Sequence, residues 1–326
     1  MQDITRQGAM RVKSPGTAEF LGADKYAVPP VMTLRELESV AWELSNQKHE
    51  DLTSLRRWFA VLVAPGGVLG GGARPKANFA EADGSLWIGK FRARDDDRDI
   101  GAWEYVVYKL AKRAGVDVPE AKFVQLNHRF HALCVKRFDH VNGMRRLYAS
   151  AMALVNKIES EGSNYLDLAQ FLRAQGDSEH TATDLEQLFR RVVFDAAVEN
   201  RDDHFRNHGF LLGKQGWRIA PAFDVTPNIN KTDHALNIDD ADNRPSLGLA
   251  ADTATLYGLN GVRAKEVIAE VAAALDGWRD EARRAQIFRA EIEIMRSAFS
   301  AHSEYRSNAR VVPARRHCRE TTSAVY

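Results

Sequence analysis

Hydrophobic residues form short runs in the first part of the chain and recur at helical spacing in the second part. The short runs predict strands at 58–63, 85–91, 122–126 and 130–135, the last two as an antiparallel pair. From Tyr148 onward, apolar residues return every three to four positions, which predicts helices. A strand-rich part followed by a helix-rich part indicates an α+β fold.

Helical spacing is clearest at 183–197, where Leu185, Leu188 and Val192 fall on one face. This core helix leads into a polar loop that begins at Asn200, and a rigid helix feeding a loop is a usual way to position functional groups. The other predicted helices are at 33–44, 103–114, 151–158, 165–173, 262–275 and 280–300.

These patterns divide the chain into four segments. We expect an N-terminal arm with a short helix at 1–55 and a small, mostly β N-lobe with a glycine-rich loop at 56–137. A larger, mostly helical C-lobe with the polar loop should occupy 138–305. Residues 306–326 carry several arginines and little apolar surface, so we expect a disordered basic tail. The hinge between the lobes should lie at 136–139.

Composition narrows the class of protein. The 326 residues carry a formal net charge of +1, so the whole chain offers no electrostatic case for binding nucleic acid. No apolar run is long enough for a membrane span, and the first sixteen residues lack the apolar region of a secretory signal. Cys134 and Cys318 lie too far apart to suggest a disulfide framework. We therefore expect a cytoplasmic protein without membrane contact.

The polar loop at 200–207 carries the strongest chemical signal. Asp202 lies five positions before Asn207, the spacing between the catalytic Asp and a Mg²⁺-binding Asn in the kinase template. In that template the Asp accepts the proton of the attacking hydroxyl. Asp202 is therefore the expected catalytic base and Asn207 an expected metal ligand, with Asp203, at a spacing of four, as the rival base.

Asp224 is the second expected metal ligand. The stretches 209–212 and 217–220 flank a Gly-Lys-Gln-Gly turn, which predicts a hairpin that returns Asp224 to the polar loop. Because Mg²⁺ prefers oxygen ligands, a carboxylate and an amide at one place suit nucleotide-bound magnesium. The pattern predicts phosphoryl transfer from ATP with Mg²⁺ as cofactor.

Three further features of the first part fit the same chemistry, although each has a simpler reading. The glycine-rich loop at 65–76 could cradle a phosphate with its backbone N–H groups, or be a plain turn. Lys90 interrupts an apolar strand and could hold the ATP phosphates, or be an edge-strand lysine. Glu104 could pair with Lys90, or only favour the dipole of its own helix.

Several segments together resemble the HipA family of serine/threonine kinase toxins. The resemblance runs from about residue 65 to 300, and the Asp-x-His-x-x-Asn block with the later Phe-Asp is its most specific part. The matching segments are GGARPK at 71–76, WIGKF at 87–91, VKRFD at 135–139, NRDDHFRNHGF at 200–210 and PAFDVTPN at 221–228.

The resemblance implies a two-lobed protein-kinase-like fold that binds ATP and Mg²⁺. It puts Asp202, Lys90 and Glu104 in the catalytic set, with Asn207 and Asp224 as metal ligands. Adenine would stack on apolar side chains at the hinge, and His204 would shape the loop rather than bind metal. The expected cofactor-binding residues are Gly70, Gly71, Gly72, Ala73, Lys76, Lys90, Lys136, Phe138 and His204.

The resemblance also implies a biological role. Such a protein would be the toxin of a toxin–antitoxin pair and would phosphorylate a Ser or Thr of a cellular protein such as an aminoacyl-tRNA synthetase. Its partner would be a helix-turn-helix antitoxin, and DNA would be contacted only through that partner.

Two departures leave other functions open. Leu69 or a neighbouring glycine stands where many family toxins carry an autophosphorylated Ser, and residues 145–150 replace the family's acidic Arg-x-His-Gln-Glu-Asp segment. One alternative is a non-catalytic kinase-like module that acts as a partner or repressor component. The other is a kinase that acts on the hydroxyl of a small molecule or a lipid.

Overall fold

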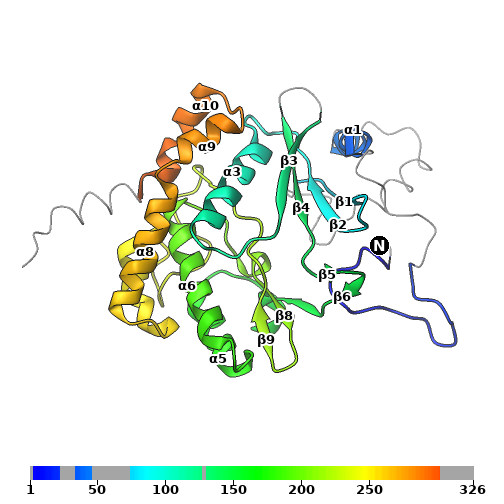
Figure 1. The fold of residues 1–326 in the computed structure, drawn as a ribbon, viewed down its shortest axis with the longest axis horizontal. Coiled ribbons are helices and arrows are strands. Elements are labelled where there is room, and N and C mark those ends of the chain that lie inside the picture. Colours follow the sequence, from blue (N-terminus) through cyan, green and yellow to red (C-terminus); the bar gives the residue numbers. More distant parts are fainter. Residues whose placement is uncertain (1–2, 23–33, 46–73, 127–129, 302–326) are drawn as a thin grey trace, which may run out of the picture.

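The structure is a computed structural model that describes residues 3–22, 34–45, 74–126 and 130–301. Its described part has two lobes, as predicted: a strand-rich N-lobe and a larger helical C-lobe (Figure 1). The strand predicted at 58–63 and most of the glycine-rich loop lie outside the described residues. Within the described part, no helix is long and apolar enough to cross a bilayer.

The described N-lobe is built on an antiparallel sheet with the strand order β1-β2-β4-β3. The predicted pairing of the last two strands is confirmed, because Phe123 lies opposite Leu133. At the other edge of the sheet, β1 pairs with β2, and Lys76 of β1 lies directly opposite Lys90 of β2. The strands are β1 (Lys76–Ala80), β2 (Leu86–Lys90), β3 (Ala121–Gln125) and β4 (His131–Lys136).

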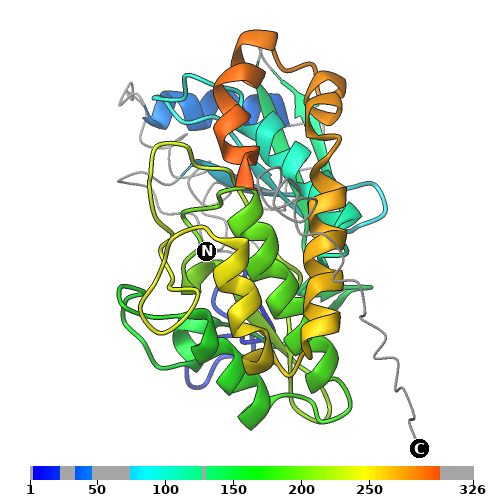
Figure 2. The ribbon, with the colours of Figure 1, turned by 90° about the vertical axis from the view of Figure 1, so that its left-hand side faces the viewer.

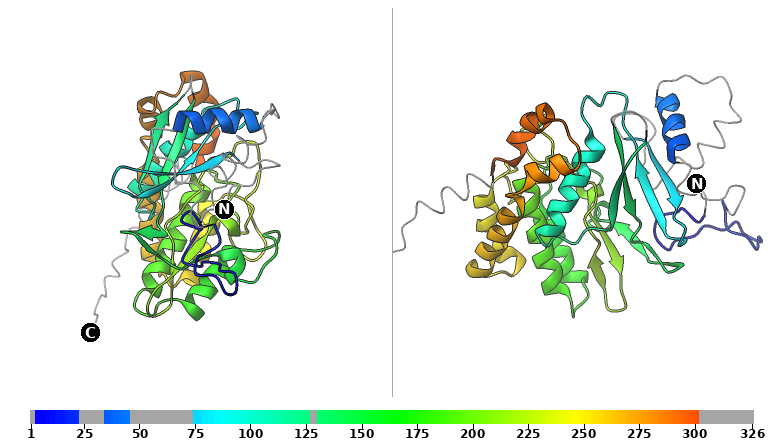
Figure 3. Two further views of the ribbon diagram at one scale, coloured as in Figure 1. Left: turned by 90° about the vertical axis from the view of Figure 1, so that its right-hand side faces the viewer. Right: turned by 45° about the horizontal axis from the view of Figure 1, so that its top comes forward.

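Two helices cover opposite faces of this sheet, α1 (Leu34–Ser45) on one side and α3 (Ile100–Arg113) on the other (Figures 1 and 3). Helix α3 begins where the Asp99 carboxylate accepts from the Ala102 N–H at 3.1 Å. The same carboxylate contacts Nδ1 of His131 at 2.5 Å, which ties the start of α3 to β4. The helix that carries Glu104 is therefore held firmly against the sheet.

The described C-lobe is organised around α6 (Thr181–Ala197), the core helix that the sequence predicted. It packs against α5 (Tyr165–Gln175), α7 (Leu247–Thr253) and α8 (Gly261–Leu275), as Figure 2 shows. Shorter elements are α4 (Ala151–Leu154), α9 (Trp278–Arg284), α10 (Arg289–Ile294), and the 3₁₀ helices η2 (Phe205–Asn207), η3 (Ala254–Tyr257) and η4 (Met295–Phe299).

Two small β elements complete the described C-lobe. Strands β7 (Tyr148–Ser150), β8 (Gly209–Leu212) and β9 (Trp217–Ile219) form one antiparallel sheet, so the predicted hairpin after the polar loop is confirmed. Strands β5 (His140–Val141) and β6 (Met144–Arg145) form a short hairpin next to the predicted hinge.

Helix α3 belongs to the same hydrophobic core as the C-lobe helices. Trp103 lies 6.3 Å from Trp278 and 6.2 Å from Phe299 between ring centroids, and its indole N–H donates to Glu291 at 2.9 Å. The orientation of Glu104 is therefore set by both lobes, while the segment boundaries proposed from sequence stay a prediction.

The prediction of a single helix at 280–300 is wrong. The described chain is broken there by Gln286, whose φ is +59°, and Ile287 donates back to the carbonyl of Ala282 at 3.1 Å. This left-handed closure ends α9 and turns Ile287 into the core, before α10 and η4 follow.

The predicted helix at 151–158 also ends early, after Leu154. Asn156 has a φ of +54°, and Lys157 donates to the carbonyl of Met152 at 3.1 Å. Tyr148, where we expected helical structure to begin, starts strand β7 instead, because it pairs with Leu211 of β8.

The predicted N-terminal arm contacts the hinge over part of its length. The Gly8 N–H donates to Asp139 at 2.7 Å, and Arg137 donates to the carbonyls of Thr5 at 2.8 Å and Arg6 at 3.0 Å. Residues 3–8 therefore lie against the hinge.

Candidate functional site

The described part of the site between the lobes is centred on Lys90, at the end of β2. Its ammonium forms ion pairs with Glu104 of α3 and with Asp224. Lys76 on β1 contacts the other oxygen of Asp224 at 3.2 Å. Two ammonium groups on directly opposed strand positions would repel each other, so the two carboxylates stabilise an otherwise unfavourable arrangement.

Lys90 and Asp224 both keep their charges at neutral pH. Burial alone would lower the pKa of Lys90, but Asp224 and Glu104 raise it above its ordinary value. Burial alone would raise the pKa of Asp224, whereas the ammonium groups of Lys90 and Lys76 hold it well below its usual range. The centre of the cluster is thus a fixed cation paired with a fixed anion.

Asp224 is held in an unusual backbone conformation, with a φ of +56°. Left-handed conformations are uncommon outside glycine and cluster at functional sites. The segment after it is tied to the start of the polar loop, because Thr226 donates to the Asn200 side chain at 3.3 Å and Asn228 donates to the Glu199 carbonyl at 2.9 Å. The backbone therefore carries Asp224 to the neighbourhood of the polar loop.

The polar loop is ordered by its own hydrogen bonds. The Asn207 amide donates to the Asp202 carbonyl at 3.1 Å, and the Asn207 N–H donates to the His204 carbonyl at 2.7 Å. Phe205, fully buried, anchors the loop in the core. Among the described residues, no hydrogen bond or ion pair joins Asp224 to Asp202 or Asn207, and the segments that carry them are linked through the Thr226 and Asn228 bonds described above.

Asp202 and Asp203 are neighbours with opposite environments. The side chain of Asp202 is 57% exposed and pairs with Lys231. Asp203 is 3% exposed and accepts from the Tyr165 hydroxyl at 2.8 Å, and its other partner is Nε2 of His208, also at 2.8 Å. Asp203 therefore faces away from any acceptor, which disfavours it as the rival base.

Asp203 belongs to a buried network under the polar loop that the sequence did not reveal. Burial and the charge of Asp203 raise the pKa of Asp195 well above its ordinary value, which favours the protonated form of Asp195. Burial would raise the pKa of Asp203 as well, but His208 and Tyr165 lower it, so Asp203 carries the charge. The signal in the sequence was Asp195, a carboxylate inside the otherwise apolar run 192–197.

A pocket of about 440 Å³ opens beside Asp202, with His204, Lys231 and His234 in its lining. His234 is 3% exposed, and neither of its ring nitrogens has a hydrogen-bond partner among the described residues. Burial, with a smaller effect of Arg201, lowers the pKa of His234 to about 4, so its imidazole is neutral at pH 7. His204 also has an unpaired, buried Nδ1 at this pocket.

The predicted hinge residues lie at a second cavity, of about 650 Å³. The ring of Phe138 lies 5.9 Å from those of both Tyr148 and Phe223, the residue before Asp224. Lys136 pairs with Glu120 at 3.2 Å and therefore does not join the Lys90 cluster. Gly70, Gly71, Gly72 and Ala73, predicted to bind the nucleotide, lie outside the described residues.

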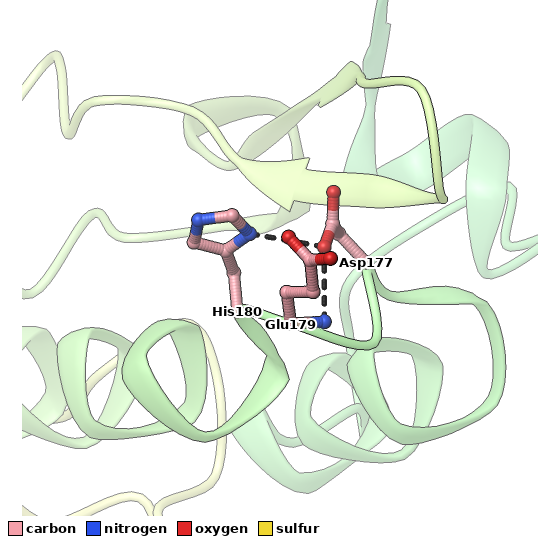
Figure 4. A group of neighbouring side chains, drawn as sticks. All are labelled: Asp177, Glu179 and His180. Carbon is pink, nitrogen blue, oxygen red and sulfur yellow. Dashed lines mark hydrogen bonds and ion pairs between the residues drawn. The ribbon is translucent and has the colours of Figure 1, made fainter.

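A third group of polar side chains, Asp177, Glu179 and His180, lies in the turn between α5 and α6 (Figure 4). Its geometry follows from local bonds, since Asp177 accepts from the Glu179 N–H at 3.1 Å and contacts Nδ1 of His180 at 3.0 Å. It stabilises the entry into α6 and shares no residue with the groups around Lys90 and Asp202.

Comparison with known proteins places these features in context. The model of the family described as "HipA-like C-terminal domain" matches residues 69–278. "Putative kinase" of Haemophilus influenzae is 28% identical over 136 residues, 37% of this chain. "Putative kinase Y4dM" of Sinorhizobium fredii is 25% identical over 165 residues, 46% of this chain. The chain spans 39% of the length of each of these relatives.

Among solved structures, the chain is similar to HipA of Shewanella oneidensis, determined in a complex with HipB and its operator DNA. The TM-score is 0.64 at 17% identity, over 91% of this chain and 74% of the other. At this identity the likeness is one of fold, and it confirms the two-lobed, kinase-like α+β architecture that the sequence predicted.

Proposed function

Because the chain belongs to the HipA-like C-terminal domain family, we propose that it is an ATP- and Mg²⁺-dependent kinase that phosphorylates serine or threonine in a protein. The observation that carries the proposal is the buried cluster in which Glu104 and Asp224 hold Lys90. A strand lysine paired with a helix glutamate is the arrangement that aims an ammonium at the phosphates of ATP in kinases.

In this proposal the two lysines of the cluster hold the triphosphate. Lys90 and Lys76 supply fixed positive charge where a phosphate chain would bind, and the pair with Glu104 keeps Lys90 from turning away. The glycine-rich loop would cover the phosphates, and Phe138 would contact the adenine at the hinge. Asp224 accepts both lysines through different oxygens, so it also positions them.

The donor set fits magnesium. The side-chain nitrogen of Asn207 donates to the Asp202 carbonyl, so the side-chain oxygen of Asn207 is available to a cation. Asp224 is a second oxygen donor, ionised and partly open to solvent. When bound, Mg²⁺ would neutralise charge on the phosphates, and oxygen ligands of this kind are the ones it prefers.

Asp202 would act as the general base. Its exposed carboxylate can accept the proton of an incoming hydroxyl, while Asn207 and the buried Asp203 network hold the loop that carries it. The acceptor would be a Ser or Thr hydroxyl of a protein, which can reach an exposed carboxylate of this kind.

The proposed role is that of a toxin held inactive by a helix-turn-helix antitoxin in the cytoplasm, with DNA bound only through that partner. The solved relative supports this proposal because it was determined together with HipB and operator DNA. Co-expression with the product of a neighbouring helix-turn-helix gene tests it, since a stable complex is expected to co-purify with this chain. Purification of the two proteins as separate species would contradict it.

The enzymatic proposal is tested with labelled ATP, Mg²⁺ and a mixture of proteins as acceptors. Asp202→Asn is expected to reduce phosphoryl transfer by about 10²–10⁴-fold, because the general base is removed. As a control, Asp252→Asn changes an exposed carboxylate on α7, and this variant should transfer phosphate at the unaltered rate. Equal rates for both variants would remove Asp202 from the role of base.

The same experiment separates the two alternative functions. A non-catalytic module would show an ATP-dependent rise in melting temperature without transfer to any acceptor. A kinase for a small molecule or a lipid would consume ATP only when such a compound replaces protein as the acceptor.

A further inference from the structure

The pocket beside Asp202 has the features of a built binding site. Its volume of about 440 Å³ lies within the range of ligand pockets, and most of the residues that line it have polar or charged side chains. It is reached from the solvent, and it includes the carboxylate that we propose as the base. The site lies apart from the buried Lys90 cluster, none of whose residues lines it.

His234 shows that this lining is incomplete without a ligand. A buried polar group normally has a hydrogen-bond partner, and leaving one unpaired is unfavourable. His234 is nevertheless 3% exposed with two unpaired ring nitrogens. Its backbone is held firmly, because its N–H donates to the Asn243 carbonyl at 2.8 Å and its carbonyl accepts from the Asn243 side chain at 2.9 Å. The ring is thus fixed at the pocket with hydrogen-bonding capacity unused.

The charges of the pocket are of both signs. Lys231 is paired with Asp202, which leaves Arg206 and Glu161 as the other charged side chains of the lining. Both are exposed, and neither makes an ion pair within the part of the chain that the structure describes. A ligand that enters here therefore meets one available cation and one available anion.

We propose that this pocket is the acceptor site and that it receives a polypeptide segment with an acidic side chain on one flank of its hydroxyl and a basic side chain on the other. The proposal rests on the kinase function proposed above. Arg206 would bind the acidic flank and Glu161 the basic flank, while His234 would hydrogen-bond the segment's backbone. A polypeptide satisfies all three groups at once, because it carries charges of both signs and backbone donors and acceptors.

Lys231 is the positioning residue of this site. Before the acceptor arrives, it holds the Asp202 carboxylate at the pocket. During transfer, the acceptor oxygen bonds to the γ-phosphorus while its proton passes to Asp202. The bond from that phosphorus to the bridging oxygen breaks, and ADP leaves with the electron pair. The Lys231 ammonium then stays beside Asp202 and the transferred group, where positive charge is favourable.

The test uses a library of serine-centred peptides with randomised flanks, labelled ATP and Mg²⁺. The unaltered protein is expected to favour peptides with one acidic and one basic flank. Arg206→Glu should reverse the preference at the acidic flank by about tenfold in relative rate, because like charges then face each other. Glu161→Lys should do the same at the other flank.

Matched controls remove the effect of net charge. Lys265→Glu and Glu293→Lys make the same changes of charge at exposed positions outside the pocket, and both should keep the original preference. A melting curve with and without ATP shows that each variant is folded and binds nucleotide. For Lys231, Lys231→Ala should lower kcat about tenfold with little change in the KM for ATP, and Lys231→Arg should restore most of the rate.

The outcomes are distinct. If Asp202→Asn abolishes transfer but the flank preferences of Arg206→Glu and Glu161→Lys match the unaltered protein, the acceptor-site proposal is overturned and the kinase proposal stands. If the library is not phosphorylated while a small-molecule hydroxyl is, the polypeptide acceptor is overturned. If Asp202→Asn transfers at the unaltered rate, the kinase proposal itself fails.

Discussion

The Lys90–Glu104 pair between the lobes and the Lys231–Asp202 pair beside the polar loop differ in their exposure to water. Between the lobes, the side chains of Lys90 and Glu104 are 9% and 3% exposed. In the pocket beside the polar loop, the side chains of Lys231 and Asp202 are 47% and 57% exposed. The same chemical pair, an ammonium and a carboxylate, is therefore used in two different ways.

Exposure decides what each pair can do. Removing one partner from a buried pair leaves an uncompensated charge, so the pair around Lys90 fixes geometry. An exposed pair contributes little to stability and exchanges readily with other partners. The first arrangement suits a site that must hold a triphosphate in one position, and the second suits a base that must stay accessible to an incoming acceptor.

The largest expected effect comes from Lys90→Ala. It should reduce phosphoryl transfer by about 10²–10³-fold and lower the free energy of unfolding by about 3 kcal/mol, because Glu104 and Asp224 lose their shared partner. Lys109→Ala, an exposed lysine of the same helix as Glu104, should change the free energy by no more than about 0.5 kcal/mol.

A lysine-to-alanine substitution at the exposed Lys231–Asp202 pair sharpens the comparison. Lys231→Ala should lower the free energy of unfolding by less than about 1 kcal/mol, measured by urea denaturation beside Lys90→Ala. Equal losses for the two variants would contradict the contrast between a buried and an exposed pair.

Asp203→Ala should have the next largest effect, on stability rather than directly on transfer. The change leaves the Tyr165 hydroxyl and His208 without their acceptor in the core, at a cost of about 3 kcal/mol in urea denaturation. Tyr165→Phe, which removes only one of these bonds, should cost about 1 kcal/mol. A fully stable Asp203→Ala protein would show that the network does not hold the polar loop.

The last prediction is a pH dependence of stability that arises from His234. Its folded pKa is about 4, below the ordinary value of 6.5, so the unfolded chain binds the additional proton first as the pH falls. The free energy of unfolding should therefore decrease between about pH 6.5 and pH 4, by up to about 3 kcal/mol from this residue.

Urea denaturation at pH 7, 5.5 and 4.5 measures this slope, and His234→Asn should make it shallower. The charged neighbours Asp203, Arg201 and Asp233 remain in both proteins, so they cancel in the comparison. A slope that is unchanged by His234→Asn would show that the imidazole is already protonated or solvated in the folded state.

Much of this architecture could be predicted from local pattern. Short apolar runs located β2, β3 and β4, helical spacing located α6, and the turn sequence after residue 212 located the β8–β9 hairpin, whereas β1 was not predicted. The order of the motifs indicated the family, and the match over 69–278 confirms it. Helix ends that depend on a left-handed residue, such as Gln286, could not be predicted, because that residue type does not mark the conformation.

The sequence alone determined which residues could carry the chemistry. The spacing of Asp202 and Asn207, and the order of Lys90, Glu104 and Asp224, are properties of the chain before it folds. Whether each serves as base, metal ligand or phosphate contact stays a prediction. Spacing was sufficient to propose these roles because a short loop places its own side chains near one another.

Only the tertiary structure decided which of two adjacent aspartates is buried and which partners each one meets. Asp203 turns inward to Tyr165 and His208, and Asp202 turns outward to Lys231. The ring nitrogens of His234 have no hydrogen-bond partner among the described residues. The Asp203–Tyr165 contact joins residues 38 positions apart, and the Asp202–Lys231 contact joins residues 29 positions apart. Burial and pairing arise from packing, so no local pattern of residues could reveal them.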